Sequence, residues 1–279
     1  MRDPLASLRE VSPDDGVVVA VSGGKDSVAA LDLCCQHFRR VDAYHLYVVP
    51  GIGFVEQYLQ FLERRYRISI HRTPSPSLAR YLRDGMFRAR TLNVPLITHS
   101  EIEAGERRRT GARWIANGMK KWDSIFRRGM ISGWGAVATR QGKLFPLADW
   151  SEAQVYRHLR QRSVPLSPTY AVFGYNWDSD LGGRSLAFIR QRWPADYAKI
   201  KQMFPLCDTE ADRWELLNGS PKISTNGTGF VPRKRGARKP AVGQPGEQPD
   251  ERRDPLPEVS DGEGPASAVE PGPLQSPDD

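Results

Sequence analysis

The most regular feature of the chain is a run of five small or β-branched apolar residues at 17–21, which ends in the polar, glycine-containing turn 22–24. A segment with Leu31 and Leu33 at apolar positions follows directly. A short apolar run bounded by a turn is typical of a buried strand, and the segment after it has the length and pattern of a helix. The pattern therefore predicts a strand, a tight loop and a helix over 27–40.

The same order of strand and helix recurs further along the chain. Residues 43–49 form a second apolar run, the next segment has apolar residues at helical spacing over 54–66, and a third short run lies at 68–71. Strands that alternate with helices at this spacing are joined by right-handed crossovers and form a parallel sheet. We therefore expect the α/β class: an open, mainly parallel sheet with helices on both faces.

The segments after residue 71 extend this pattern. Ser151 has the position of a helix N-cap, and Pro165 and Pro168 hold their neighbours extended. The predicted elements are helices at 77–90, 101–109 and 152–162, a helix start at 123–124, a strand from 114 to the turn at Gly118, a short strand from 143 to Pro146, an extended arm at 164–170, and short helices between 193 and 205.

Composition divides the chain into parts. Residues 221–279 contain 11 of the 22 prolines, one Phe, and no Trp, Tyr or Cys. Such a segment buries too little apolar surface to offset the entropy lost on ordering. We expect a lead-in at 1–15, one α/β domain at 16–219 and a disordered tail at 220–279. The sequence has no run of 18 apolar residues and no recognisable signal peptide, which predicts a cytoplasmic protein without a membrane partner.

The formal net charge of +7 comes from the front of the chain. Residues 1–220 hold 32 Lys and Arg against 23 Asp and Glu, giving +9, and the remainder holds 8 against 10, giving −2. A basic surface of this kind attracts nucleic acid or an acidic protein, whereas the basic run 233–239 also fits a solvated linker. The three cysteines form no C-x-x-C pair, which excludes a disulfide framework and a cysteine-rich metal site.

The turn after the first strand carries the densest candidate chemistry, Ser22-Gly23-Gly24-Lys25-Asp26-Ser27. A glycine turn at a helix start presents backbone N–H groups at the positive end of the helix dipole, where phosphate binds. The serines and Lys25 add side-chain donors. The spacing is not that of the G-x-x-x-x-G-K-S/T loop. These residues predict a phosphate site, and a purely structural glycine turn is the alternative.

Two further segments are expected to contribute to that site. Residues 50–53 follow the second strand, and in open α/β sheets ligands lie beyond the carboxyl ends of the strands, so this turn is predicted to take adenine and ribose. Lys120, Lys121, Arg127 and Arg128 bracket an Asp-Ser helix start. These four cations resemble a clamp for a polyphosphate or its leaving group.

Four stretches between residues 16 and 215 resemble the phosphoadenosine phosphosulfate reductase family, which includes the ATP-binding subunit of sulfate adenylyltransferase. The similar motifs are S-G-G-x-D-S at 22–27, D-T-G-x-x-F-p-E at 50–56 with one position fewer, G-I-R-x-x-E-S at 118–124, and P-L-x-D-W at 146–150 followed by the arm at 164–170. The resemblance implies an adenine nucleotide alpha-hydrolase-like fold, with 22–27 as a loop that holds the β,γ-pyrophosphate of ATP. It also implies ATP and Mg²⁺ as cofactors.

The chain departs from this family in two places. The reductases of the family use a cysteine near the C-terminus as nucleophile, and that motif is missing, while Pro50 stands where the family has Asp. Reductive attack requires a thiolate. A sulfonucleotide also has no β,γ-pyrophosphate for the loop to hold. We therefore expect an enzyme that cleaves ATP between the α- and β-phosphates, adenylylates an unidentified acceptor and releases pyrophosphate.

The resemblance also implies roles for single residues. Lys25, Asp26, Arg127 and Arg128 are the expected catalytic residues, and Asp26 is the expected Mg²⁺ ligand. Two alternatives stay open: a sulfonucleotide reductase that uses Cys207 or a partner thiol, and a non-catalytic, nucleotide-dependent nucleic-acid-binding protein. The expected nucleotide-binding residues are Ser22, Gly23, Gly24, Lys25, Asp26, Ser27, Gly51, Gly53, Gly118, Lys120 and Asp149.

Overall fold

The computed structural model describes residues 4–177 and 179–221. These residues belong to the first of two units of the chain, Met1–Arg233. The second unit, Lys234–Asp279, lies outside the described residues, as do the basic run 233–239 and the predicted disordered tail from residue 222 onward.

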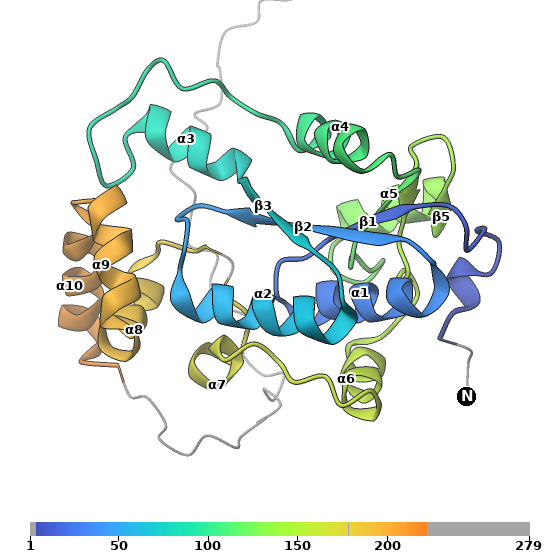
Figure 1. Cartoon of the computed structure of the whole chain (residues 1–279). Helices are drawn as coiled ribbons and strands as arrows, with labels where there is room; N and C mark the ends of the chain where they lie inside the picture. The colour runs from blue at the N-terminus through green and yellow to red at the C-terminus, as the bar shows by residue number, and fades with distance from the viewer. Residues whose placement is uncertain (1–3, 178, 222–279) are drawn as a thin grey trace, which may run out of the picture. The chain divides into compact units, whose positions relative to one another are not determined.

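The described chain is built on a six-stranded sheet with the strand order β3-β2-β1-β4-β6-β5 (Figure 1). Neighbouring strands are parallel throughout, except that β5 pairs with β6 in the antiparallel direction. The expected open, mainly parallel sheet is therefore confirmed. The strands are β1 (Val17–Ala20), β2 (Val41–Tyr47), β3 (Ile70–Pro74), β4 (Trp114–Ala116), β5 (Val137–Ala138) and β6 (Lys143–Leu144).

Helices cover both faces of the sheet, as Figure 1 shows for α1 and α2 on one side and α3 and α4 on the other. The helices of the described residues are α1 (Lys25–His37), α2 (Gly53–Tyr66), α3 (Pro76–Asp84), α4 (His99–Thr110), α5 (Ile125–Trp134), α6 (Glu152–Gln161), α7 (Thr169–Phe173), α8 (Gly183–Arg192), α9 (Pro194–Met203) and α10 (Cys207–Asn218), with a short 3-10 helix at Ala6–Leu8.

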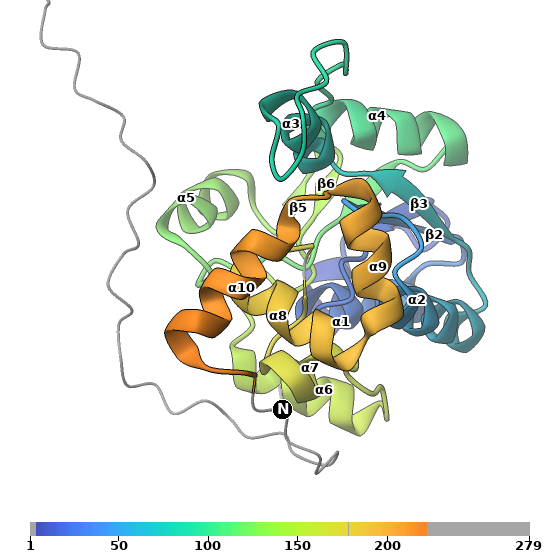
Figure 2. The same cartoon turned by 90° about the vertical axis from the view of Figure 1, so that its left-hand side faces the viewer.

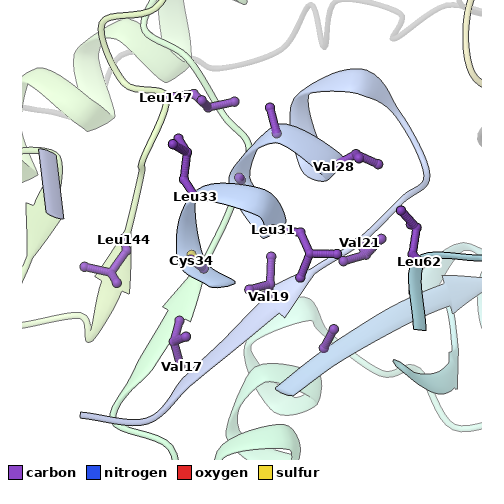
Figure 3. Packing of buried hydrophobic residues seen from close by; sticks show 14 of the residues in the cluster. Val17, Val19, Val21, Val28, Leu31, Leu33, Cys34, Leu62, Leu144 and Leu147 are labelled. Carbon is purple, nitrogen blue, oxygen red and sulfur yellow. The ribbon is translucent and has the colours of Figure 1, made fainter. Parts of the chain in front are cut away.

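The alternation of side chains along β1 explains this layering. Val17 and Val19 are fully buried on the face covered by α1 and α2, and Figure 3 shows Val19 beside Leu31 of α1. Val18 is fully buried on the opposite face, where it packs in one cluster with Ile102 of α4. Because successive strand residues point to opposite faces, the continuous apolar run places β1 at the centre of the sheet.

The ends of several elements differ from the sequence prediction. The helix predicted over 77–90 stops at Asp84, because Gly85 adopts a left-handed φ of 76° and caps it. The arm predicted at 164–170 turns into α7 from Thr169. The two-residue strand β5 was not predicted, since so short a segment has no recognisable period.

The helices α8, α9 and α10 pack together beside the carboxyl end of β2, as both Figure 1 and Figure 2 show. Their buried residues form one cluster with the segment after β2; it includes Val49, Ile52, Leu186, Ile200 and Phe204. The short helices expected between 193 and 205 are thus part of a layer that stabilises the turn after β2. Among residues 4–177 and 179–221, no helix combines the length and the apolar character needed to cross a membrane.

A buried charged network joins α1 to α6. Asp32 on α1 is fully buried, and its carboxylate lies 2.8 Å from His158 Nε2, 2.9 Å from the Tyr66 hydroxyl and 3.1 Å from Arg162 Nε. Burial raises the pKa of the Asp32 carboxyl, but the hydrogen bonds from His158 and Tyr66 and the charge of Arg162 outweigh this and hold it below its ordinary value. The core therefore contains a compensated negative charge behind the first helix.

We predict that Asp32→Asn lowers the free energy of unfolding by about 3–5 kcal/mol at pH 7, because it leaves the partners of a buried charge unpaired. The lowered pKa determines how stability depends on pH. The contribution of Asp32 to the free energy of unfolding is fully present above about 3.9, the pKa of Asp in the unfolded chain, and is lost as the pH falls through the lower pKa of the folded state. Urea unfolding at pH 7 and below pH 4 measures both effects. Tyr66→Phe, which removes one hydrogen bond, should cost about 1 kcal/mol. A loss under 1 kcal/mol for Asp32→Asn at pH 7 would contradict this account.

Candidate functional site

The candidate site lies where the strand order of the sheet reverses. The chain passes from β1 outward to β2 and β3, and then returns to β4 on the other side of β1. Loops that follow two such neighbouring parallel strands diverge, and open α/β sheets bind ligands in the crevice between them. Residues 22–24 follow β1 and residues 117–124 follow β4, so two of the motifs predicted to bind the nucleotide meet at this point.

Residues 22–27, which we call the pyrophosphate loop after the motif they resemble, are held by their own serines. The hydroxyls of Ser22 and Ser27 lie 3.1 Å apart, and the Ser27 hydroxyl donates to the Gly24 carbonyl at 2.9 Å. Gly23 has a φ of 82°, a conformation that glycine adopts without steric cost. The loop therefore turns sharply from β1 into α1.

Several backbone N–H groups at the start of α1 face no internal acceptor. The N–H of Lys25 donates to the Tyr170 hydroxyl at 2.9 Å. In contrast, the N–H groups of Gly23, Asp26 and Ser27 have no acceptor within the described part of the chain. Unsatisfied N–H groups at a helix N-terminus carry partial positive charge and attract anions. The loop thus offers the donors that a phosphate group requires.

Two lysines converge on Asp26. Lys25 Nζ lies 2.9 Å from Asp26 Oδ2 and 3.5 Å from Glu152 Oε1, and Lys120 Nζ lies 2.6 Å from Asp26 Oδ1 and 3.1 Å from Asp123 Oδ1. Burial lowers the pKa of Lys25, but the hydrogen bond to Asp26 and the nearby carboxylates raise it above its ordinary value, so the amine is charged at neutral pH. Lys120 is only 5% exposed and brings a second cation into the loop.

Gly118 allows the segment after β4 to approach the pyrophosphate loop. A Cβ atom on Gly118 would lie 2.6 Å from the carbonyl carbon and oxygen of Asp26 and 2.7 Å from the Ser27 nitrogen. These are backbone atoms, so a side chain at this position would displace the loop itself. The glycine is therefore what allows Lys120, two residues later, to contact Asp26.

The fit of Mg²⁺ to the site depends on Asp26. Its Oδ1 atom is buried and, although close to Lys120, accepts no well-directed hydrogen bond. Within residues 4–177 and 179–221, no group of three or more Asp, Glu, His or Cys is placed to hold a metal ion. Mg²⁺ at nucleotide sites commonly takes one or two carboxylates and completes its shell with phosphate oxygens and water. Asp26 fits that smaller role, and its assignment as a metal ligand stays a prediction.

The other predicted cations have their described contacts outside the pyrophosphate loop. Arg127 pairs with Asp123 at 3.0 Å and is thereby linked to Lys120. Lys121 pairs with the exposed Asp149 at 2.7 Å. Arg128 stacks over the ring of Trp122, with its guanidinium 4.8 Å from the ring centroid. The described contacts of Arg128 and Asp149 do not include the pyrophosphate loop, so their predicted roles rest on sequence alone.

The turn after β2 is closed by a residue of α9. The N–H groups of Gly53 and Phe54 donate to the two oxygens of Asp196, at 2.6 and 3.2 Å. Lys199 pairs with Asp196 and donates to the Gly51 carbonyl. The N-terminus of α2 is thus already capped by a carboxylate. Of the two glycines of this turn, Gly51 is the more open, since an added Cβ would meet no atom within 4 Å there but would lie 3.1 Å from both Asp196 oxygens at Gly53. The adenosine site at this turn stays a prediction.

Sequence reasoning missed three residues that surround the pyrophosphate loop. Asn176 donates from Nδ2 to the Ser22 carbonyl at 2.9 Å, and its Oδ1 would lie 3.4 Å from a Cβ on Gly23. Tyr170 accepts from the Lys25 N–H, and Glu152 lies near the Lys25 amine. Tyr170 ends the arm at 164–170, whose prolines are a recognisable signal in the sequence. No sequence pattern marks Glu152 or Asn176 as contacts of a loop that is distant along the chain.

All three thiols of the chain are held in their neutral form. Cys207 is fully buried, with its sulfur 3.8 Å from the Tyr197 hydroxyl, and burial raises the pKa of its thiol. Burial also raises the pKa of Cys34 well above its ordinary value and that of Cys35 to about 12. Because the thiolate is the nucleophile, these cysteines are poorly suited to the sulfonucleotide reductase alternative.

Comparison with known proteins finds similar folds in solved structures. A U34-tRNA thiolase, NcsA, from Methanococcus maripaludis has 13% identity and a TM-score of 0.43, covering 74% of this chain and 76% of its own. An NH3-dependent NAD synthetase from Campylobacter jejuni has 12% identity and a TM-score of 0.39, and the match covers 77% of this chain and 92% of the synthetase chain. An FMN adenylyltransferase from Candida glabrata has 13% identity and a TM-score of 0.40, and the match covers 61% of this chain and 54% of the adenylyltransferase chain.

No protein-family model and no curated protein matches the sequence. The likeness to the phosphoadenosine phosphosulfate reductase family is therefore carried by the four motifs alone. At these identities and scores the solved structures carry no argument about the reaction, which has to rest on the residues of the site.

We predict that Gly118→Ala weakens ATP binding at least tenfold, because the added methyl group would overlap the backbone of Asp26 and Ser27. Gly129→Ala in α5 is the matched control, since its Cβ would meet no atom within 4 Å and alanine favours a helix by about 1 kcal/mol. Isothermal titration calorimetry with ATP and thermal unfolding of both variants measure the difference. Equal ATP affinity in wild type and Gly118→Ala would show that the two loops do not act together.

Proposed function

We propose that this chain is an ATP-dependent enzyme that cleaves ATP between the α- and β-phosphates, transfers the adenylyl group to an acceptor and releases pyrophosphate. The observation that supports the proposal most is the convergence of free N–H groups with two lysine amines at the pyrophosphate loop. Such a set of donors suits a dense polyanion better than a single neutral ligand.

In this proposal the pyrophosphate loop binds the β- and γ-phosphates. The N–H groups of Gly23, Asp26 and Ser27 donate to phosphate oxygens, since they have no acceptor in the described chain. The Ser22 hydroxyl can rotate away from Ser27 to donate to a phosphate oxygen, and the charged amine of Lys25 offsets phosphate charge. A phosphate that draws Lys25 away from Asp26 leaves that carboxylate free, and Mg²⁺, when bound there, would neutralise further charge on the phosphates.

The transfer step is an attack at the α-phosphorus. A lone pair of the acceptor forms the new bond to phosphorus, and the bond from phosphorus to the α,β-bridging oxygen breaks, so that its electron pair leaves with pyrophosphate. Negative charge develops on the leaving group. In this proposal the amine of Lys120 stabilises that charge; its burial supports the role, because a preformed cation in a partly water-excluded site acts strongly on developing charge. Arg127, linked through Asp123, supports the same charge.

We predict that Lys25→Ala and Asp26→Ala each weaken ATP binding roughly 10- to 100-fold, since a hydrogen bond to a charged group contributes about 1.5–3 kcal/mol. Calorimetry with ATP and Mg²⁺ measures the affinity, and a coupled assay for pyrophosphate follows turnover. Lys201→Ala is the matched control, because Lys201 is an exposed lysine that pairs with Asp208 on α10. Unchanged affinity in both Lys25→Ala and Asp26→Ala would refute the proposed binding mode.

A further inference from the structure

Helix α5 and the segment just before it expose an unusual group of apolar side chains. Trp122 is 63% exposed, Ile125 is 87% exposed and Phe126 is 78% exposed. These three residues, together with Gly129 and Gly133 on the same helix, are named here the α5 surface. Single exposed apolar residues are common, but two aromatic rings and an isoleucine within five positions form a patch of the kind that marks an interaction site.

The composition of α5 is not explained by the stability of the helix. Within α5 the buried residue is Ile131. Gly129 and Gly133 each lower the stability of the helix by about 1 kcal/mol relative to alanine. Gly129 and Gly133 are four positions apart, and an added Cβ on either would meet no atom within 4 Å. Because residues four apart share a helix face, the two glycines leave backbone exposed along one side of the helix.

The charge of the surrounding segment limits what kind of partner fits. Residues 119–143 contain six Lys and Arg and a single acidic residue, Asp123. Three of the lysines pair with carboxylates from elsewhere, Asp26, Asp149 and Glu103, so six cations face four carboxylates and the surface keeps a net charge of +2. Arg128 has no carboxylate partner within the described chain and lies instead over the Trp122 ring. Two copies of this chain that met through α5 would bring these like charges together, which disfavours self-association. The complementary partner is an anion with flat apolar groups.

We propose that the α5 surface binds single-stranded nucleic acid. Bases stack on the exposed rings of Trp122 and Phe126, and the guanidinium groups of Arg127 and Arg128 contact the phosphates. Stacking on aromatic side chains beside a basic surface is how proteins hold single strands without reading their sequence. The bare backbone at the two glycines leaves room for the strand to approach closely.

The position of this surface connects it to the candidate site. Ser124 caps α5, and its neighbour Asp123 pairs with Lys120, whose amine contacts Asp26 in the pyrophosphate loop. A strand on the α5 surface therefore lies next to the residues proposed to hold ATP. If the proposed adenylyl transfer holds, the acceptor belongs to the class of nucleic acids; the binding itself does not depend on that reaction.

The test uses the full chain and fluorescein-labelled 12-nucleotide single strands of mixed sequence, DNA and RNA, in fluorescence anisotropy titrations without ATP. Trp122→Ala and Phe126→Ala should each weaken binding about 5- to 100-fold, since the stacking of one base contributes about 1–3 kcal/mol. The affinity should fall as salt rises. Leu216→Ala, at a residue that is also 87% exposed but on α10, is the matched control and should leave binding unchanged.

The variants distinguish binding at the α5 surface from binding at the basic run 233–239 or at the pyrophosphate loop. The basic run is present in every variant, so it cannot produce a difference between them. Lys25→Ala should still bind the strand, so failure of ATP binding and failure of strand binding are distinguishable. Wild-type affinity in both aromatic variants would overturn the inference. So would equal binding of poly-glutamate, which would indicate an acidic protein, or a concentration-dependent dimer lost in Phe126→Ala, which would indicate a second copy.

Discussion

The contact between Lys120 and Asp26 is the interaction on which the site depends. It joins the segment after β4 to the loop after β1, across the point where the strand order reverses. A buried lysine is costly unless its charge is compensated, and here two carboxylates, Asp26 and Asp123, compensate it. Gly118 makes the contact possible by leaving space for the backbone of Asp26.

The same compensation of charge is visible along α1. Its first turn carries free N–H groups and the charged Lys25, while Asp32, further along the helix, is held as a buried carboxylate by partners from α2, α6 and the residue after α6. The helix is therefore held both at its N-terminus, beside the pyrophosphate loop, and at a buried anionic centre. We infer that the position of the pyrophosphate loop is set by the packing of α1 as much as by the glycines within it.

The sequence predicted the parts of the fold that depend on local signals. The apolar run before Ser22 identified β1, and the glycine turn identified the loop, because both signals lie within one short segment. The end of α3 at Asp84 was not predicted, because the segment was expected to be helical through residue 90 and Gly85 was not recognised as its C-cap. Asp196 at the start of α2 and Asn176 over the loop were beyond sequence reasoning, because their contacts join residues more than 140 positions apart. Tertiary contacts of that separation leave no periodic pattern in the chain.

The most direct test of the central claim is the identity of the products formed from ATP. The full chain is incubated with Mg²⁺ and ATP labelled at either the α- or the γ-phosphate, together with single-stranded oligonucleotides, sulfate or small-molecule acceptors, and the products are separated by chromatography. The account predicts that the γ-label appears in pyrophosphate and the α-label in an AMP-bearing acceptor, in equal amounts. Release of the γ-label as orthophosphate with formation of ADP would contradict it.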